Sequence, residues 1–256
     1  MGLAVATARP VIWLLAGLDP TGGAGLLRDL WTLRARLPAA QVCAVVSAWT
    51  WQGEALPARA EARPLLRIMG ELRGFPRPDV VKVGLLPSTL IQQGLLESLV
   101  ELTGGVPWVV DPVMFASDGG DLGARPADLR ELARHAALVT PNRGEAALLA
   151  ACCAEEPDLA ASLGRRMPGP AWLVKGGHAT GNEVVDRLWI RGRIHEFRRP
   201  RLSGPDPRGT GCALASAITA GLAQRIAADP RQGFQAGGLI DAVDGAIRWL
   251  DGVRQR

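Results

Sequence analysis

Short apolar runs alternate with amphipathic stretches along most of the chain. The apolar runs predict buried strands at residues 11–16, 42–48, 80–85, 106–110, 137–140 and 171–174. Apolar residues at helical spacing predict helices at residues 26–37, 61–73, 89–102, 129–136, 213–223 and 239–253, and a further helix after residue 145. Residues 184–190 and 193–197 predict a hairpin. This alternation predicts an α/β fold with a mostly parallel sheet, helices on both faces, and a ligand site at the carboxyl ends of the strands.

Composition and charge narrow the class of protein. With 256 residues and 48% hydrophobic content, the chain can bury a substantial core, and no linker or repeat divides it, so we expect one domain over residues 1–256. The net charge of +4 comes from scattered arginines, which argues against a nucleic-acid partner. No apolar run approaches the ~18 residues of a membrane span, and residues 1–10 lack a secretion signal. Adjacent Cys152 and Cys153 give no disulfide framework. We therefore predict a cytoplasmic protein without a membrane partner.

The segment RGTGC, residues 208–212, stands directly before a predicted helix. Its glycines allow a tight turn that aims consecutive N–H groups in one direction, and a helix N-terminus carries partial positive charge. This combination predicts an anion site, above all for a phosphate. The cysteine falls on the first helical turn, where the dipole favours a thiolate. A plain glycine turn that opens a packed helix is the alternative.

Other polar residues follow the predicted strands or begin a helix. Asp111 stands at a strand end, where a carboxylate is suited to ligand or magnesium chemistry, although it could instead cap a turn. Lys175 also stands at a strand end, before two glycines that permit close approach of a ligand, and a solvated lysine in a tight turn is the alternative. Asn142 and Glu145 lie three residues apart at a helix start, so they either share a water shell or cap the helix. Gln52 follows Trp49 and Trp51, and its amide could bind the edge of a heterocycle between aromatic walls, or it could be an exposed loop residue beside two core tryptophans.

Lysine is a scarce residue type in this chain. It stands at positions 82 and 175, whereas arginine supplies the other long cationic side chains. A chain with this bias keeps a lysine where a compact ammonium is needed and a planar guanidinium does not fit.

Six motifs stand in order along the chain: AGLDPTGGAG, VKVGLL, VVDPVM, LVTPNRGEAALL, VKGGHATG and GTGCALASAITAGLA. With this ordered set, the chain resembles the ribokinase-like superfamily, and within it the hydroxymethylpyrimidine and phosphomethylpyrimidine kinases of thiamine biosynthesis. The resemblance spans nearly the whole chain and implies a ribokinase-like three-layer fold. It also implies a kinase that uses ATP and Mg²⁺ to phosphorylate hydroxymethylpyrimidine, its monophosphate, or both.

The resemblance implies roles for individual residues. The anion hole, with a thiol in place of the aspartate base of ribokinase proper, is implied at Gly209, Thr210, Gly211 and Cys212. Lys175 is implied to contact the ATP phosphates, Asn142 and Glu145 to support magnesium and its waters, and Asp111 is a second candidate metal ligand. The pyrimidine pocket is implied at Gly17, Ala24, Asp29, Gln52, Leu85 and Val113.

The chain departs from the family pattern at a few positions. Relatives usually carry Thr-His before GTGC and Thr or Ser after it, where this chain has Pro207, Arg208 and Ala213, and Trp31 stands where the first helix often has lysine. Three functions stay open at this point: the pyrimidine kinase, a pyridoxal-type kinase of the same fold, and a non-catalytic pyrimidine-binding regulatory homologue. A homodimer is also left open.

Overall fold

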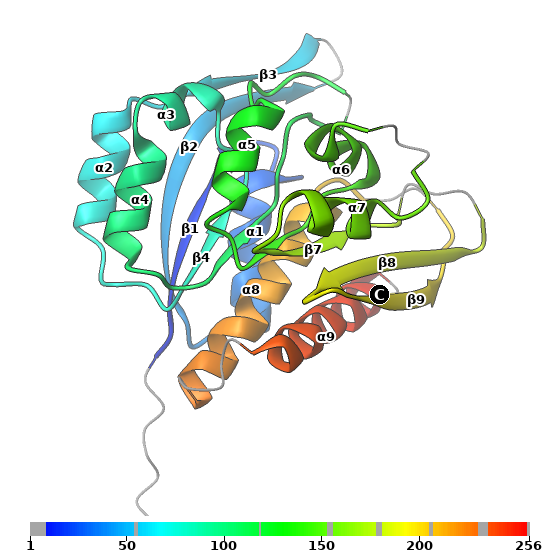
Figure 1. The fold of residues 1–256 in the computed structure, drawn as a ribbon. Coiled ribbons are helices and arrows are strands. Elements are labelled where there is room, and N and C mark those ends of the chain that lie inside the picture. Colours follow the sequence, from blue (N-terminus) through cyan, green and yellow to red (C-terminus); the bar gives the residue numbers. More distant parts are fainter. Residues whose placement is uncertain are drawn as a thin grey trace, which may run out of the picture.

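The computed structural model describes residues 9–53, 56–117, 119–152, 156–177, 181–204, 207–229 and 235–254, without the side chains of residues 52, 53, 56 and 57. Within these ranges, nine strands form one sheet in the order β3-β2-β1-β4-β5-β6-β7-β8-β9 (Figure 1). They are β1 (Val11–Leu18), β2 (Gln41–Gly53), β3 (Leu56–Ala62), β4 (Val80–Val83), β5 (Trp108–Val110), β6 (Leu138–Val139), β7 (Ala171–Val174), β8 (Glu183–Ile190) and β9 (Arg193–Pro200).

The sheet is parallel at its centre and antiparallel at its two edges. Strands β2, β1, β4, β5, β6 and β7 pair in parallel, whereas β3 pairs antiparallel with β2, and the β8–β9 hairpin continues antiparallel from β7. All the parallel strands therefore end on the same side of the molecule. This arrangement confirms the predicted mostly parallel sheet and the predicted hairpin.

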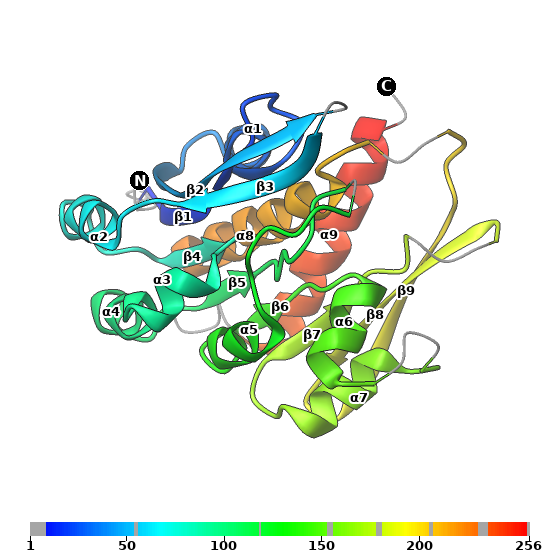
Figure 2. The ribbon, with the colours of Figure 1, turned by 90° about the horizontal axis from the view of Figure 1, so that it is seen from above.

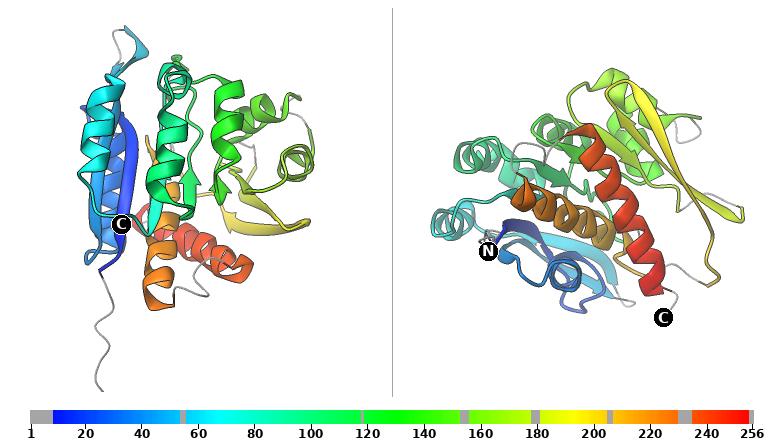
Figure 3. Two further views of the ribbon diagram at one scale, coloured as in Figure 1. Left: turned by 60° about the vertical axis from the view of Figure 1, so that its left-hand side comes forward. Right: turned by 90° about the horizontal axis from the view of Figure 1, so that it is seen from below.

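Helices cover both faces of the sheet, which confirms the three-layer α/β architecture (Figures 2 and 3). One face carries α1 (Gly25–Arg36), α8 (Thr210–Ala228) and α9 (Ala236–Arg254). The other carries α2 (Leu65–Arg73), α3 (Ser88–Gln92), α4 (Leu95–Thr103), α5 (Pro126–Ala133), α6 (Arg143–Ala150) and α7 (Leu159–Arg166).

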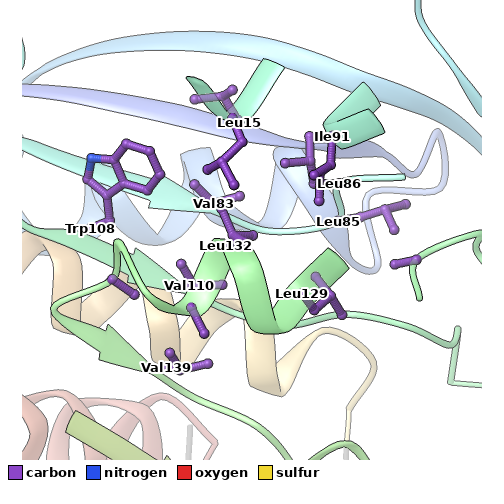
Figure 4. Packing of buried hydrophobic residues seen from close by; sticks show 14 of the residues in the cluster. Leu15, Val83, Leu85, Leu86, Ile91, Trp108, Val110, Leu129, Leu132 and Val139 are labelled. Carbon is purple, nitrogen blue, oxygen red and sulfur yellow. The ribbon is translucent and has the colours of Figure 1, made fainter. Parts of the chain in front are cut away.

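Alternating residues of the strands supply two separate cores. On β1, Trp13 and Leu15 point into the core beneath α2 to α7, and Ile12 and Leu14 into the core beneath α1, α8 and α9. Successive strand residues face opposite sides of a sheet, so a continuous apolar run serves both layers. Figure 4 shows the first core, where strand and helix side chains interleave. Near-complete burial on both faces explains why these strands read as uninterrupted apolar runs.

Two helix predictions were wrong in part, and one helix was missed. Residues 61 and 62 belong to β3 and not to the helix predicted at 61–73, because Pro64 disfavours helical geometry before it and stands as the N-cap of α2. The helix predicted at 89–102 is divided into α3 and α4 at Gly94, whose φ of +94° interrupts the helical path. Helix α7 was not predicted, although Asp158 caps it by accepting from the Ala161 N–H.

None of the helices described in the structure is long and apolar enough to cross a membrane.

Candidate active site

A cavity of about 430 Å³ opens where the parallel strands end. It is lined by the loop between β1 and α1, the segments that follow β4, β5 and β7, the start of α6 and the start of α8. The cavity brings together all but one of the residues predicted for the site: Gly17, Ala24, Asp29, Leu85, Asp111, Val113, Asn142, Glu145, Lys175, Gly209, Thr210, Gly211 and Cys212. The exception is Gln52, whose side chain lies outside the described part of the chain. Their individual roles stay predictions.

Helix α8 begins at the edge of this cavity and points its N-terminus into it. Gly209 is the N-cap, with a left-handed φ of +73°, and a Cβ there would lie 2.3 Å from the carbonyl oxygen of Gly23. Only glycine meets both conditions without strain. The Thr210 hydroxyl donates to the Pro207 carbonyl, which fixes the turn before the helix. The first N–H groups of a 19-residue helix thus face the cavity, as an anion site requires.

Lys175 lies against this helix start and pairs with Asp111. The Lys175 Nζ atom is 2.9 Å from Asp111 Oδ1, and a Cβ on Gly211 would lie 2.9 Å from the same Nζ. Burial opposes the charge of Lys175, but Asp111 and Glu145 outweigh it and raise its pKa. Burial likewise opposes the charge of Asp111, but Lys175 and Lys82 outweigh it and lower its pKa. The two groups are therefore an ion pair next to the helix N-terminus.

Asn142 and Glu145 form a capping box and also face the cavity. The Asn142 side chain accepts from the Glu145 N–H at 2.9 Å, and the Glu145 side chain accepts from the Asn142 N–H at 2.8 Å. Burial raises the pKa of Glu145 to about 7, against the opposing effect of Lys175. The pair thus caps α6 and, in the same position, holds a carboxyl group near Lys175.

Asp111 and Glu145 supply the oxygen donors that Mg²⁺ prefers. No group of three or more His, Cys, Asp or Glu side chains in the described ranges is arranged to hold a metal. Mg²⁺ usually keeps several waters and binds through one or two carboxylates together with substrate phosphates. Two carboxylates that line the cavity beside the N-terminus of α8 fit that mode of binding.

Cys212 lines the cavity on the first turn of α8, where the charges of Asp111, Asp29 and Lys82 act on it. Burial, together with the negative charges of Asp111 and Asp29, raises the pKa of its thiol to about 12. In the free protein Cys212 is therefore a thiol at neutral pH. Burial and two carboxylates therefore oppose the thiolate that the helix position was expected to favour, and the positive charge of Lys82 does not offset them.

A buried ion pair under the cavity was missed. Lys82 of β4 donates to Asp29 of α1 at 2.7 Å, both side chains are 0% exposed, and Ser216 of α8 donates to the other Asp29 oxygen at 2.7 Å. A Cβ on Gly84 would lie 2.8 Å from Lys82 Nζ, so the glycine leaves the space that the ammonium occupies. Both carboxylate oxygens of Asp29 are thus engaged by protein groups, which makes it a residue that holds Lys82 and α8 in place. The signal in the sequence was a scarce lysine inside a strand that is otherwise entirely apolar.

A second ion pair joins the loop before α1 to the segment before α8. Arg208 Nη2 lies 3.2 Å from Oδ2 of Asp19, whose side chain is 0% exposed. Asp19 also accepts from the N–H groups of Thr21 and Ala24 and therefore organises its own loop. Arg208, one of the departures from the family pattern, lines the cavity and thus contacts the loop between β1 and α1.

The β8–β9 hairpin holds the loop that carries Lys175. Asp186 of β8 is buried, accepts from the Gly176 N–H at 2.7 Å, and is bound by Arg199 of β9 at 2.6 Å. Arg201 donates to the carbonyl of Gly177 at 2.7 Å. The hairpin therefore fixes the backbone on which Lys175 stands.

Comparisons with known proteins agree with this geometry. A sequence profile described as phosphomethylpyrimidine kinase matches residues 19–232. A hydroxymethylpyrimidine/phosphomethylpyrimidine kinase of Streptomyces coelicolor is 35% identical over 233 residues, which cover 84% of this chain and 81% of that protein. The solved structure of a phosphomethylpyrimidine kinase from Clostridium difficile is 26% identical, with a TM-score of 0.72, and the match covers 96% of this chain and 99% of that one. A pyridoxal kinase of Bacillus subtilis, solved with ADP, is 21% identical with a TM-score of 0.77 over 94% of this chain and 90% of that one, and it shares the fold.

Proposed function

Because the chain belongs to the phosphomethylpyrimidine kinase family, we propose that it transfers the γ-phosphoryl group of ATP to hydroxymethylpyrimidine, to its monophosphate, or to both, in thiamine biosynthesis. The observation that supports this proposal most is that Lys175, Asp111, Glu145 and Cys212 come from four separate segments and line one cavity at the N-terminus of α8. Phosphoryl transfer depends on positioning and on neutralising charge, and these groups supply both.

The reaction exchanges one bond to phosphorus for another. An acceptor oxygen attacks the γ-phosphorus, the bond between this phosphorus and the β,γ-bridging oxygen breaks, and ADP leaves. The N–H groups at residues 209–212 face the oxygens of the transferred group, and Lys175 contributes a cation on the nucleotide side. Asp111 and Glu145 would hold Mg²⁺, which would neutralise phosphate charge when bound.

The acceptor half of the cavity is lined by small and apolar groups, including Gly17, Leu85 and Val113. A Cβ on Gly17 would lie 2.7 Å from the Leu85 side chain, so the glycine keeps this wall thin. A flat heterocycle suits such a wall. A hydroxymethyl acceptor releases a proton during transfer, and Cys212 is the candidate to accept it as a thiolate, so this role requires that the pKa of about 12 in the free protein fall when nucleotide and metal bind. A dianionic phosphate acceptor releases no proton.

The test is ADP release by the purified protein at high enzyme concentration, with Mg²⁺ and each pyrimidine in turn, and with pyridoxal beside them. Turnover of a pyrimidine in preference to pyridoxal is expected. Absence of turnover on both pyrimidines would refute the proposal. Calorimetry separates the non-catalytic alternative, because a regulatory homologue binds pyrimidine without nucleotide, whereas a kinase binds both.

Two variants test the residue roles. Lys175→Ala should weaken the use of ATP more than the binding of pyrimidine, and the opposite pattern would place the nucleotide on the other side of the cavity.

Cys212→Ala should lower turnover of the hydroxymethyl acceptor roughly 100-fold with nucleotide affinity nearly unchanged, as expected for loss of a general base. Cys152→Ala, outside the cavity, is the matched control. Full activity of the Cys212 variant would exclude the thiol as the base. A cytoplasmic location and a homodimer also stay predictions.

A further inference from the structure

Arg208 stands where the loop between β1 and α1 meets the glycine turn before α8. Its Nη2 atom contacts Asp19 at 3.2 Å, and a Cβ on Gly23 would lie 3.6 Å from its Cζ atom. Gly209, the next residue, packs so closely on the same loop that a Cβ would lie 2.3 Å from the Gly23 carbonyl oxygen. The guanidinium is therefore held against the residue 19–24 loop, one position before the anion-binding turn.

Arg208 also differs from the two lysines around this turn in exposure. The Lys82 side chain is 0% exposed and faces Asp29, and Lys175 is 14% exposed and faces Asp111. The Arg208 side chain is 39% exposed and lines the same cavity. Of these three cations, Arg208 is thus the one most accessible to a ligand, and it contacts the loop that includes Gly17 and Ala24, for which acceptor binding is proposed.

The two acceptors considered above differ by one phosphate group. An acceptor phosphate must lie beside the transferred phosphoryl group, so two anionic groups come together at the start of α8 and repel each other. A guanidinium binds phosphate through paired N–H groups, and with five N–H donors it can serve more than one acceptor at a time. Asp19, which also accepts from Thr21 and Ala24, keeps the arginine at this position.

We propose that Arg208 is a specificity-determining residue that binds the phosphate of the phosphorylated pyrimidine and makes the monophosphate the preferred acceptor. This inference rests on the proposed kinase function. The acceptor phosphate oxygen forms the new bond to the γ-phosphorus, ADP leaves with the electrons of the broken bond, and no proton is transferred when the acceptor is dianionic.

The experiment compares kcat/KM for both acceptors in the unaltered protein, Arg208→Gln and Arg208→Lys. Arg208→Gln should lower kcat/KM for the monophosphate by roughly 10- to 100-fold, the range for a lost hydrogen bond between charged groups, and by at least about tenfold more than for hydroxymethylpyrimidine. Arg208→Lys should restore a substantial part of the loss. Arg225→Gln, on the exposed surface of α8, is the matched control and should change neither value.

Equal losses of kcat/KM for the two acceptors in Arg208→Gln would overturn the inference and would indicate that Arg208 only joins the two loops. Calorimetric binding of each acceptor provides a readout that does not depend on turnover. If the unaltered protein turns over neither pyrimidine, the kinase function fails, yet an Arg208-dependent preference for binding the monophosphate still supports the inference. Equal binding of both acceptors before and after substitution refutes it independently.

Discussion

Replacement of Lys82 by methionine should destabilise the protein far more than loss of any exposed ion pair. Lys82 and Asp29 are both 0% exposed and lie 2.7 Å apart. Methionine fills a similar volume, so the change removes the charge and leaves no large cavity, but the carboxylate of Asp29 stays buried with only the Ser216 hydroxyl described beside it. Breaking a buried pair by removing one partner costs about 3–5 kcal/mol. Such a loss is a large part of the ~5–15 kcal/mol that stabilises a typical domain.

The assay is urea denaturation of the unaltered protein, Lys82→Met, Asp29→Leu and the double variant. The double variant removes both charges together, so it should be at least ~2 kcal/mol more stable than the sum of the single losses predicts. The exposed Arg225–Asp241 pair, with side chains 44% and 61% exposed, is the control and should contribute less than ~1 kcal/mol. A loss below ~1 kcal/mol in Lys82→Met would refute the view that this pair joins β4, α1 and α8 beneath the cavity.

Three further predictions follow from the site. Asp186→Asn keeps an acceptor for the Gly176 N–H but removes the charge, so KM for ATP should rise about three- to tenfold while KM for the pyrimidine stays unchanged. Asp186→Ala removes the acceptor as well and should raise KM for ATP further. Equal effects on both substrates would contradict a role of Asp186 in holding the loop that carries Lys175. Gly209→Ala places a Cβ against the Gly23 carbonyl oxygen at a left-handed φ, so it should abolish turnover and destabilise the fold by more than ~1 kcal/mol. Gly70→Ala on α2 adds a Cβ in open space and should stabilise the fold by ~0.5–1 kcal/mol in the same urea titration. In metal-free buffer, the folded-state pKa of Glu145 of about 7 exceeds its ordinary value, so its contribution to stability is complete below about pH 4.5 and is lost as pH rises through about 7. Glu145→Gln should therefore flatten the plot of urea midpoint against pH between these two values. An unchanged slope would count against the raised pKa.

The layered fold follows directly from the apolar pattern. Runs such as 11–16 and 171–174 are buried on both faces, and this leaves a strong and continuous signal in the sequence. The edge strand β3 carries no such signal, because its residues alternate with charged ones and it pairs with one neighbour only. The helix predicted at residues 61–73 extended the helical spacing of apolar residues back into β3, whereas the helix begins at Leu65. A single left-handed glycine at residue 94 likewise divides a helix whose apolar spacing continues across the break.

The family, the kinase class and the three-layer fold were all predicted from ordered motifs and are confirmed by the comparisons. Motif positions also indicated which residues would meet, because the ends of parallel strands converge at one edge of the sheet. The motif positions did not indicate which side chains would pair with one another. The Arg208–Asp19 and Lys82–Asp29 pairs join residues far apart in the sequence, and only the packing of α8 on α1 and β4 brings them together.

The charges around the cavity indicate how the proposed site would hold a nucleotide and its metal together. Asp29, Lys82, Asp111, Lys175 and Glu145 form a buried set in which acids and lysines are neighbours, so that with Glu145 protonated two carboxylates balance two ammonium groups. With Glu145 ionised, three carboxylates exceed two ammonium groups, and this excess repels free nucleotide while it attracts a divalent cation. A nucleotide that carries Mg²⁺ supplies the missing positive charge and lowers the cost of ionising Glu145. Binding of nucleotide and metal should therefore be mutually favourable, with the helix N-terminus and Lys175 left to meet the phosphate oxygens that the metal does not cover.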